Sequence, residues 1–324
     1  MDFELSDDQQ ALSDGVRAFL DGRLDMAGVR AYETAGSLDR DRWQEMAGTG
    51  IFGLRLAEVD GGVGLGVADA ALVFEELGRH LVAGPLVATH LAAGSFPGAA
   101  DGSAIVGLVD DVEDSTPVLV EHLDSLDLLV LCGPDGVRLA DLDAVRGAAM
   151  PIEHPTDPLT PVHRMPAMPA GDVVISGDEA VDFAMAGTTL TAAFQAGLAL
   201  RAVELSVAYA KERIQFDRPI GGFQAVKHLL ADMLVAAEVA RVAVYSAAVH
   251  LDDPSVGDVD RAVRAAKVVA GEAAVKCGKT AIQVHGGMGF TWEVDAHLLL
   301  KRAWVLDTHF GTADHHALAL ADAL

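Results

Sequence analysis

Two short segments in the C-terminal half of the chain carry side chains suited to a ligand with phosphates and a flat ring. The first segment runs from Glu212 to Gln224 and contains Arg213 and Phe216, next to a loop that Pro219 keeps out of helical geometry. An arginine there can hold a phosphate through two hydrogen bonds, and a neighbouring phenylalanine can pack on a flat ring. An arginine at a helix C-terminus also complements the helix dipole, so this segment alone does not separate binding from a structural role.

The second segment, Gln283–Thr291, is rich in glycine. Gly286, Gly287 and Gly289 would let backbone N–H groups approach a ligand closely, and Gln283 offers both a donor and an acceptor. Glycines after a helix also form a C-cap and a turn, and capping alone would explain the first pair. His285, beside them, is expected to pack rather than to bind a phosphate.

Four Ala-rich stretches with helical periodicity position these segments. They cover residues 187–215, 222–251, 258–286 and 293–306. The run Asp252-Asp253-Pro254 separates the second stretch from the third, and the Gly286-Gly287 pair ends the third. Short connections between long helices predict an antiparallel bundle.

The N-terminal half divides into a helical part and a part rich in β-branched residues. Ser6 and Gln9 form a capping-box pattern that opens a helix, and further helices are expected over 41–50 and 67–81. Short strands are expected over 104–109, 117–120, 127–132 and 136–139, with a hairpin at Gly133–Gly136, and the prolines of 151–169 indicate edges and loops. The predicted fold is mainly α with a small central β domain: a helical domain at 1–100, a β domain at 101–178 and a helical bundle at 179–324.

Composition excludes several classes of function. The 324 residues carry a formal net charge of -25, with 51% apolar and only 5% aromatic residues. This composition favours packed helices, and the charge argues against nucleic acid or an anionic membrane as a partner. Charged residues are expected to interrupt the apolar runs before they could span a bilayer.

Cysteine usage and the first residues of the chain predict a cytoplasmic protein. Cys132 and Cys277 are expected to be buried free thiols, because they lie apart and form no Cys-x-x-Cys motif. The stretch Met1–Leu5 lacks the features of a signal peptide. The acidic and histidine residues from Asp307 to His316 match no metal-site spacing, so no metal is expected.

The combination of motifs resembles the acyl-CoA dehydrogenase family. Glu-Arg-x-x-Phe-x-x-Pro-Ile-x-x-Phe-Gln at 212–224, Leu-Ala-Asp-Met at 230–233 and Gln-x-x-Gly-Gly-x-Gly-Phe at 283–290 are typical of its C-terminal bundle, and Trp43 and the Gly61-Gly62 loop agree with its N-terminal domain. The resemblance implies FAD as the cofactor and oxidation of the α,β bond of an acyl-CoA thioester. It further implies that one set of residues contacts FAD bound mainly by a neighbouring subunit: Arg213, Gln215, Phe216, Gln224, Gln283, Gly286 and Gly287.

This chain departs from the family where a catalytic base would stand. Phe310 occupies the common position of the base, and Gly187 occupies the second known position. The middle region lacks the Gly-rich loop and the tryptophan strand that hold a flavin in the same chain, and Thr312-Ala313-Asp314 replaces a Thr-x-Gln flavin contact. Glu204 and Glu212 could act as bases, but their predicted faces point away from position 187, so they are expected to be solvated.

The family residues that are missing here belong to the active site that the chain would form by itself. The family residues that are retained are those that contact the flavin of a partner subunit. The chain therefore resembles the non-base subunit of the α2β2 acyl-CoA dehydrogenases of actinobacterial steroid-CoA catabolism, in which a homologous partner supplies the catalytic glutamate. Two alternatives stay open at this point: a self-sufficient homotetrameric dehydrogenase with a relocated base, and a non-redox protein that binds acyl-CoA or only a partner.

Overall fold

The computed structural model describes residues 5–24, 26–110 and 117–323. It divides into two compact units, each described here by itself. The helical unit comprises residues 1–26, 71–82 and 189–324, and the sheet unit comprises residues 27–70 and 83–188. Two long helices, α4 and α7, begin in the sheet unit and end in the helical unit, as their residue numbers show.

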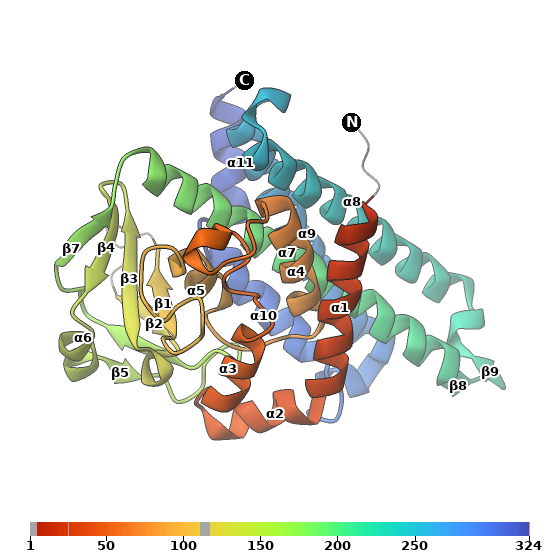
Figure 1. Cartoon of the computed structure of the whole chain (residues 1–324). Helices are drawn as coiled ribbons and strands as arrows, with labels where there is room; N and C mark the ends of the chain where they lie inside the picture. Colours follow the sequence, from red (N-terminus) through yellow and green to blue (C-terminus); the bar gives the residue numbers. More distant parts are fainter. Residues whose placement is uncertain (1–4, 25, 111–116, 324) are drawn as a thin grey trace. The chain divides into compact units, whose positions relative to one another are not determined.

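The helical unit is built around long antiparallel helices (Figure 1). Its elements are α1 (Asp7–Arg23), the end of α4 (Val67–Arg79), most of α7 (Asp178–Glu212), α8 (Gln224–Asp252), α9 (Val259–His285), α10 (Ala296–Thr308) and α11 (Ala313–Asp322). Side chains at the N-termini cap three of them: Ser6 and Gln9 form the expected capping box on α1, Asp258 caps α9 and Thr312 caps α11.

Glycine allows α4 and α7 to pack with their backbones in contact. A Cβ at Gly197 would lie 2.0 Å from the Glu75 carbonyl oxygen, and one at Gly78 would lie 2.1 Å from the Phe194 carbonyl oxygen. No side chain fits at either position. The opposing glycines therefore fix the register of the two helices.

Within its described residues, the sheet unit holds two small sheets and four short helices. The helices are α2 (Met26–Ala35), α3 (Arg40–Ala47), α5 (Leu86–Ala92) and α6 (Leu142–Ala148). One sheet has the order β1 (Val106–Val109), β3 (Leu128–Gly133), β4 (Gly136–Ala140), β7 (Gly171–Ile175), and the other β2 (Val118–Glu121), β6 (Val162–Met165), β5 (Met150–Pro151). Phe96, Val106, Val130 and Ile175 belong to the core of the larger sheet.

The predicted fold class is confirmed: the chain is mostly helical with a small β content. The Gly133–Gly136 hairpin is confirmed, since β3 and β4 pair antiparallel with Gly133 opposite Gly136. The four bundle helices lie close to the expected ranges, whereas α2, α5, α6 and α11 were not predicted. The three-domain boundaries stay a prediction.

The expectation that charged residues interrupt every apolar run before it could span a bilayer was wrong. Residues 183–200 contain no charged side chain, and both α7 and α8 are long and apolar enough to cross a bilayer. In α7 the most apolar window is 89% buried, as in the core helix of a globular protein, but in α8 it is only 28% buried. The apolar face of α8 therefore needs a separate explanation.

Candidate functional site

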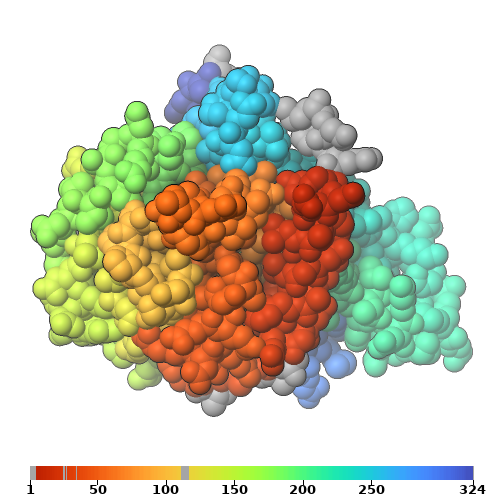
Figure 2. All heavy atoms as spheres, in the orientation of Figure 1, coloured from red at the N-terminus to blue at the C-terminus, as the bar shows by residue number. Residues whose placement is uncertain are grey.

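The first predicted segment forms a short hairpin at the end of α7. The helix ends at Glu212, and β8 (Ile214–Gln215) pairs with β9 (Arg218–Pro219). Phe216 and Asp217 turn the chain with φ of 53° and 63°, and the Ile220 N–H donates to the Arg213 carbonyl at 2.8 Å. The hairpin projects from the helical unit (Figures 1 and 2), so its side chains are displayed rather than packed.

The second predicted segment follows α9 directly. Gly286 has φ of 62°, and the 3-10 turn Gly286–Phe290 continues the chain. A Cβ at Gly286 or Gly287 would meet nothing within 4 Å, so both glycines border open space. The positive φ of Gly286 is typical of a residue that caps a helix C-terminus. Because nothing lies close to Gly286 or Gly287, a ligand could approach the backbone of both residues.

An aromatic contact brings the two segments together. The Tyr209 ring, one turn before the end of α7, stacks on His285 at the end of α9 with 4.2 Å between ring centroids. The Tyr209 hydroxyl also lies 4.0 Å from the Met288 sulfur. His285 is buried and its Nδ1 lies 2.7 Å from the Ala281 carbonyl oxygen, so its expected packing role is confirmed. Sequence reasoning missed Tyr209, because only the fold pairs residues so far apart.

Every residue predicted to contact FAD is exposed. The set shares the ends of α7 and α9 and the start of α8: Arg213, Gln215, Phe216, Gln224, Gln283, Gly286 and Gly287. Phe216 is 86% exposed, which is unusual for a large apolar ring and costs hydration free energy unless a ligand or a partner covers it. The surface thus offers a cation, amide groups, open backbone and a bare ring.

Further side chains at the hairpin were not predicted. The Arg218 guanidinium lies 4.0 Å from the centre of the Phe223 ring, and Phe216 meets the same ring edge-on at 5.9 Å. Arg218 is thereby fixed beside Arg213's loop. The carboxylates of Glu212 and Asp217 are also exposed here, so the local charge is mixed. The sequence did contain a signal for the contact between Arg218 and Phe223, because the two residues lie on either side of a pair of glycines.

Phe310, the residue at the family's common base position, lies in a tightly held turn between α10 and α11. Phe310 and Gly311 have φ of 53° and 89°. The buried Lys267 ammonium donates to the Leu306 and Asp307 carbonyls at 3.0 and 3.1 Å, and Asp307 Oδ1 accepts from the Ala313 N–H at 3.2 Å. Asp307 is therefore engaged in closing the turn.

His316 adds a second tie to the same turn. Its Nε2 lies 2.7 Å from the Phe310 carbonyl oxygen, and burial lowers the pKa of His316. No group of three His, Cys, Asp or Glu side chains suited to a metal occurs within residues 5–24, 26–110 and 117–323.

Glu204 does not behave as predicted. Its carboxylate pairs with Arg79 and lies 3.6 Å from Arg201, while Arg79 also reaches Glu76 at 3.1 Å. Glu76 in turn pairs with Arg17 at 2.6 Å and has a fully buried side chain. The prediction that Glu204 is merely solvated was wrong, because the fold brings α1, α4 and α7 into one ion-pair chain.

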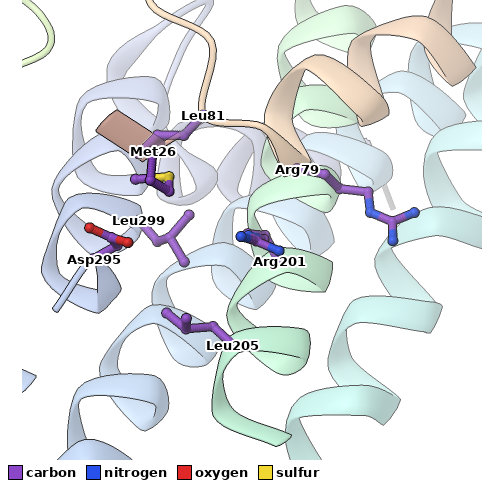
Figure 3. Close-up of a pocket in the computed structure, with 7 residues that line it drawn as sticks. All are labelled: Met26, Arg79, Leu81, Arg201, Leu205, Asp295 and Leu299. Atoms are coloured by element: carbon purple, nitrogen blue, oxygen red, sulfur yellow. The ribbon is translucent and has the colours of Figure 1, made fainter. Parts of the chain in front are cut away.

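A pocket in the helical unit lies beside this ion-pair chain and not at the predicted site. It is small and partly open to solvent, and Figure 3 shows its lining: Met26, Arg79, Leu81, Arg201, Leu205, Asp295 and Leu299. Arg79 pairs with Glu204 and Glu76, and Arg201 lies 3.6 Å from Glu204, so both guanidinium groups already face a carboxylate. None of the predicted FAD contacts lines it.

The two thiols are unreactive by environment. Cys277 is buried and Cys132 is half-buried, and both are free. Burial raises the pKa of Cys132 to about 11 and that of Cys277 to about 12, so both stay protonated at neutral pH. The prediction of free thiols is confirmed within the described residues, with Cys132 less buried than expected.

Comparison with known proteins places the chain in a family. Residues 6–104 match the acyl-CoA dehydrogenase N-terminal domain, and residues 180–324 match the acyl-CoA dehydrogenase C-terminal domain. The acyl-CoA dehydrogenase IpdE2 of Mycobacterium tuberculosis is 34% identical, with 92% of this chain and 91% of that protein covered. The chain belongs to the acyl-CoA dehydrogenase family. IpdE2 of Mycolicibacterium smegmatis is 32% identical over 92% of this chain and 93% of that protein.

Solved structures share the fold over nearly its whole length. The Tcur3481-Tcur3483 steroid ACAD G363A variant has a TM-score of 0.82 and 27% identity, covering 97% of both chains. The ChsE4-ChsE5 complex from Mycobacterium tuberculosis has a TM-score of 0.83 at 24% identity, covering 99% of this chain and 98% of that chain. The acyl-CoA dehydrogenases are FAD-dependent oxidoreductases, in agreement with the cofactor predicted from the sequence motifs.

Proposed function

We propose that this chain is the non-base subunit of a heteromeric, FAD-dependent acyl-CoA dehydrogenase. In this assembly the chain contributes contacts to FAD, and a homologous partner supplies the carboxylate that removes the α-proton. The observation that carries the proposal is a division within one chain. The FAD-contact residues of the family are present and exposed, whereas both base positions hold residues that cannot accept a proton.

The exposed residues fit a flavin dinucleotide chemically. Arg213 can pair with a phosphate, the amides of Gln215, Gln224 and Gln283 can hydrogen-bond polar edges, and the bare Phe216 ring can cover a flat surface. Gly286 and Gly287 allow close approach of the backbone. FAD, when bound, supplies the hydride acceptor for the β-hydrogen of the substrate.

The proton at the α-carbon must go to another chain. Phe310 has no proton acceptor and Gly187 has no side chain. Asp307, the carboxylate on the same turn as Phe310, caps the Ala313 N–H. Glu204 is occupied by arginines. Asp307 and Glu204 therefore serve structural roles, and this favours a base supplied by the partner.

The exposed face of α8 supports a partner subunit. Its apolar residues Leu234, Val235, Val239 and Val242 are 46%, 63%, 52% and 54% exposed, although the helix is among the most apolar in the chain. A patch of this kind favours association over solvent exposure. The solved relative with 27% identity is named as a pair, Tcur3481-Tcur3483, which supports a heteromer, and we propose the α2β2 arrangement.

The same comparison supports a proposal for the substrate class. The Tcur3481-Tcur3483 structure is described as a steroid ACAD, so we propose a steroid side-chain CoA thioester for this chain's complex. The reaction is α,β-desaturation in the cytoplasm. Acidic composition and free thiols agree with that compartment.

Flavin absorbance tests the proposal directly. The chain is purified alone and after co-expression with an adjacent dehydrogenase-like gene product, and bound flavin is measured by its visible spectrum. We expect flavin only in the co-expressed complex. Stoichiometric flavin on the chain alone would favour the homotetrameric dehydrogenase, and colourless protein in both preparations would favour a scaffold.

A further inference from the structure

Two polar side chains inside the helical unit have no hydrogen-bond partner within the described part of the chain. Gln195 is fully buried, and neither its Oε1 nor its Nε2 is paired. Thr191, one turn earlier on α7, is also fully buried with an unpaired Oγ1. A buried amide and a buried hydroxyl lose their hydration on folding, so leaving both unpaired is costly.

The packing of α7 shows which way these groups face. Gly197 and Phe194 meet α4, whereas Gln195 Nε2 approaches α9. A Cβ built at Gly271 of α9 would lie 3.6 Å from Gln195 Nε2 and 3.0 Å from Asp307 Oδ1 of α10. Gln195 Nε2 and Asp307 Oδ1 therefore both lie close to Gly271, where α7, α9 and α10 come together.

The neighbouring polar groups are already engaged with one another. Lys267, one turn before Gly271, donates to the carbonyls at the end of α10, and Asp307 accepts from the Ala313 N–H. His316 bonds the Phe310 carbonyl. These contacts close the turn between α10 and α11 without reaching Gln195 or Thr191, so the amide and the hydroxyl are left for a group from outside the chain.

We propose that Thr191 and Gln195 form an interior subsite that binds one hydroxyl-type oxygen, a group that both donates and accepts. Gln195 offers a donor at Nε2 and an acceptor at Oε1, and Thr191 can do either. Two sources supply this chemistry: an ordered water, or a hydroxyl on the acyl part of an acyl-CoA. Gly187 and Phe310 hold the family's two base positions. Gly187 precedes Thr191 by one turn of α7, and Asp307 lies at the end of α10, just before the turn that carries Phe310. The second source therefore rests on the proposed function.

A crystal structure that resolves ordered waters tests the subsite itself. It is determined on the purified hetero-complex, or on the chain alone if that crystallises, and it does not depend on any enzymatic activity. We expect an oxygen peak within hydrogen-bond distance of Gln195 and Thr191, which disappears in Gln195→Leu and in Thr191→Val. A dry site in the wild-type protein overturns the proposal. If the site is dry, Gln195→Leu and Thr191→Val should both raise the Tm. Gln44→Leu, on the exposed face of α3, is the control.

Ligand titration separates the two sources. Two cyclic acyl-CoA thioesters with the same carbon skeleton, one hydroxylated and one not, are titrated into the complex. If the oxygen comes from the ligand, the hydroxylated thioester binds about tenfold more tightly, and Gln195→Leu and Thr191→Val abolish the difference. Equal affinities with the crystallographic peak present identify the oxygen as water. Absence of flavin or acyl-CoA binding would count against the proposed function but would leave the crystallographic result standing.

Discussion

Arg213 and Phe310 represent the two kinds of residue that distinguish this chain. Arg213 extends a charge into solvent at the end of α7, where only a ligand or another chain can use it. Phe310 is held inside a turn that Lys267, Asp307 and His316 secure. One position carries an exposed charge and the other is held in a turn, which agrees with the proposed subunit that completes a neighbour's site.

Replacing Arg213 with alanine should weaken FAD retention in the hetero-complex. Loss of a charge-assisted hydrogen bond to phosphate costs about 1.5–3 kcal/mol, or roughly a 10- to 100-fold increase in the FAD dissociation constant. Flavin fluorescence released on dilution measures this constant. Arg261→Ala, another exposed arginine of the helical unit, serves as the control. Equal flavin retention in both variants would remove Arg213 from the site.

His90 should make the stability of the sheet unit depend on pH. It is buried on α5, its Nδ1 lies 3.0 Å from the Ile51 carbonyl oxygen, and burial lowers the pKa of His90 to about 4. Between pH 6.5 and 4 the unfolded chain therefore binds more protons than the folded chain. The stability is complete above pH 6.5 and falls as pH drops towards 4, by about 3 kcal/mol in total.

Urea unfolding at several pH values measures the contribution of His90. His90→Gln should flatten the pH dependence, whereas His154→Gln, an exposed histidine of the same unit, should leave it unchanged. An identical pH profile in the wild-type protein and in His90→Gln would contradict the assignment.

At the scale of elements, contact between α4 and α7 depends on glycine. A methyl group at Gly197 would collide with the Glu75 carbonyl at 2.0 Å, so Gly197→Ala should destabilise the protein by about 3 kcal/mol. Gly15 in α1 has nothing within 4 Å of its Cβ position, so Gly15→Ala should stabilise by about 0.5–1 kcal/mol. Chemical denaturation of both variants checks the opposite signs, and similar effects at the two positions would rule out the backbone contact.

The exposed face of α8 should matter for assembly and not for folding. Val239→Glu places a charge where an apolar partner face is expected, which should weaken the hetero-complex by about tenfold or more. The Tm of the chain itself should change little, because Val239 is already 52% exposed. Leu318→Glu on α11, at a residue 67% exposed, is the matched control. Light scattering of the co-expressed complex reports assembly, and an intact complex with Val239→Glu would place the partner elsewhere.

At the scale of the whole molecule, adding a carboxylate should not create a second active site. Phe310→Glu, paired with a partner whose own base has been removed, is expected to show only background acyl-CoA oxidation. A base contributes about 10²–10⁴-fold only when it is positioned beside the reacting carbon and a hydride acceptor. Turnover of an acyl-CoA by this pair would show that a flavin is bound in this chain's own pocket, and the proposed division of labour would be wrong.

The sequence by itself determined the local features of this protein. Helical periodicity marked the bundle, Ser6 and Gln9 marked the start of α1, and Gly133–Gly136 marked the β3–β4 hairpin. These features depend on residues close together in the chain, so their patterns are visible without the fold. The family motifs at 212–224 and 283–290 likewise indicate the acyl-CoA dehydrogenase family and FAD from the sequence alone.

Only the tertiary structure decided how distant residues are used. Tyr209 stacks on His285, Glu204 pairs with Arg79, and Gln195 approaches Gly271 because separate helices converge there. The apolar side chains of α7 and α8 look alike in sequence, yet one helix is buried and the other is largely exposed. Hydrophobic periodicity shows that a face must be covered, but it does not say whether the same chain or a partner covers it, since both remove the same apolar surface from water.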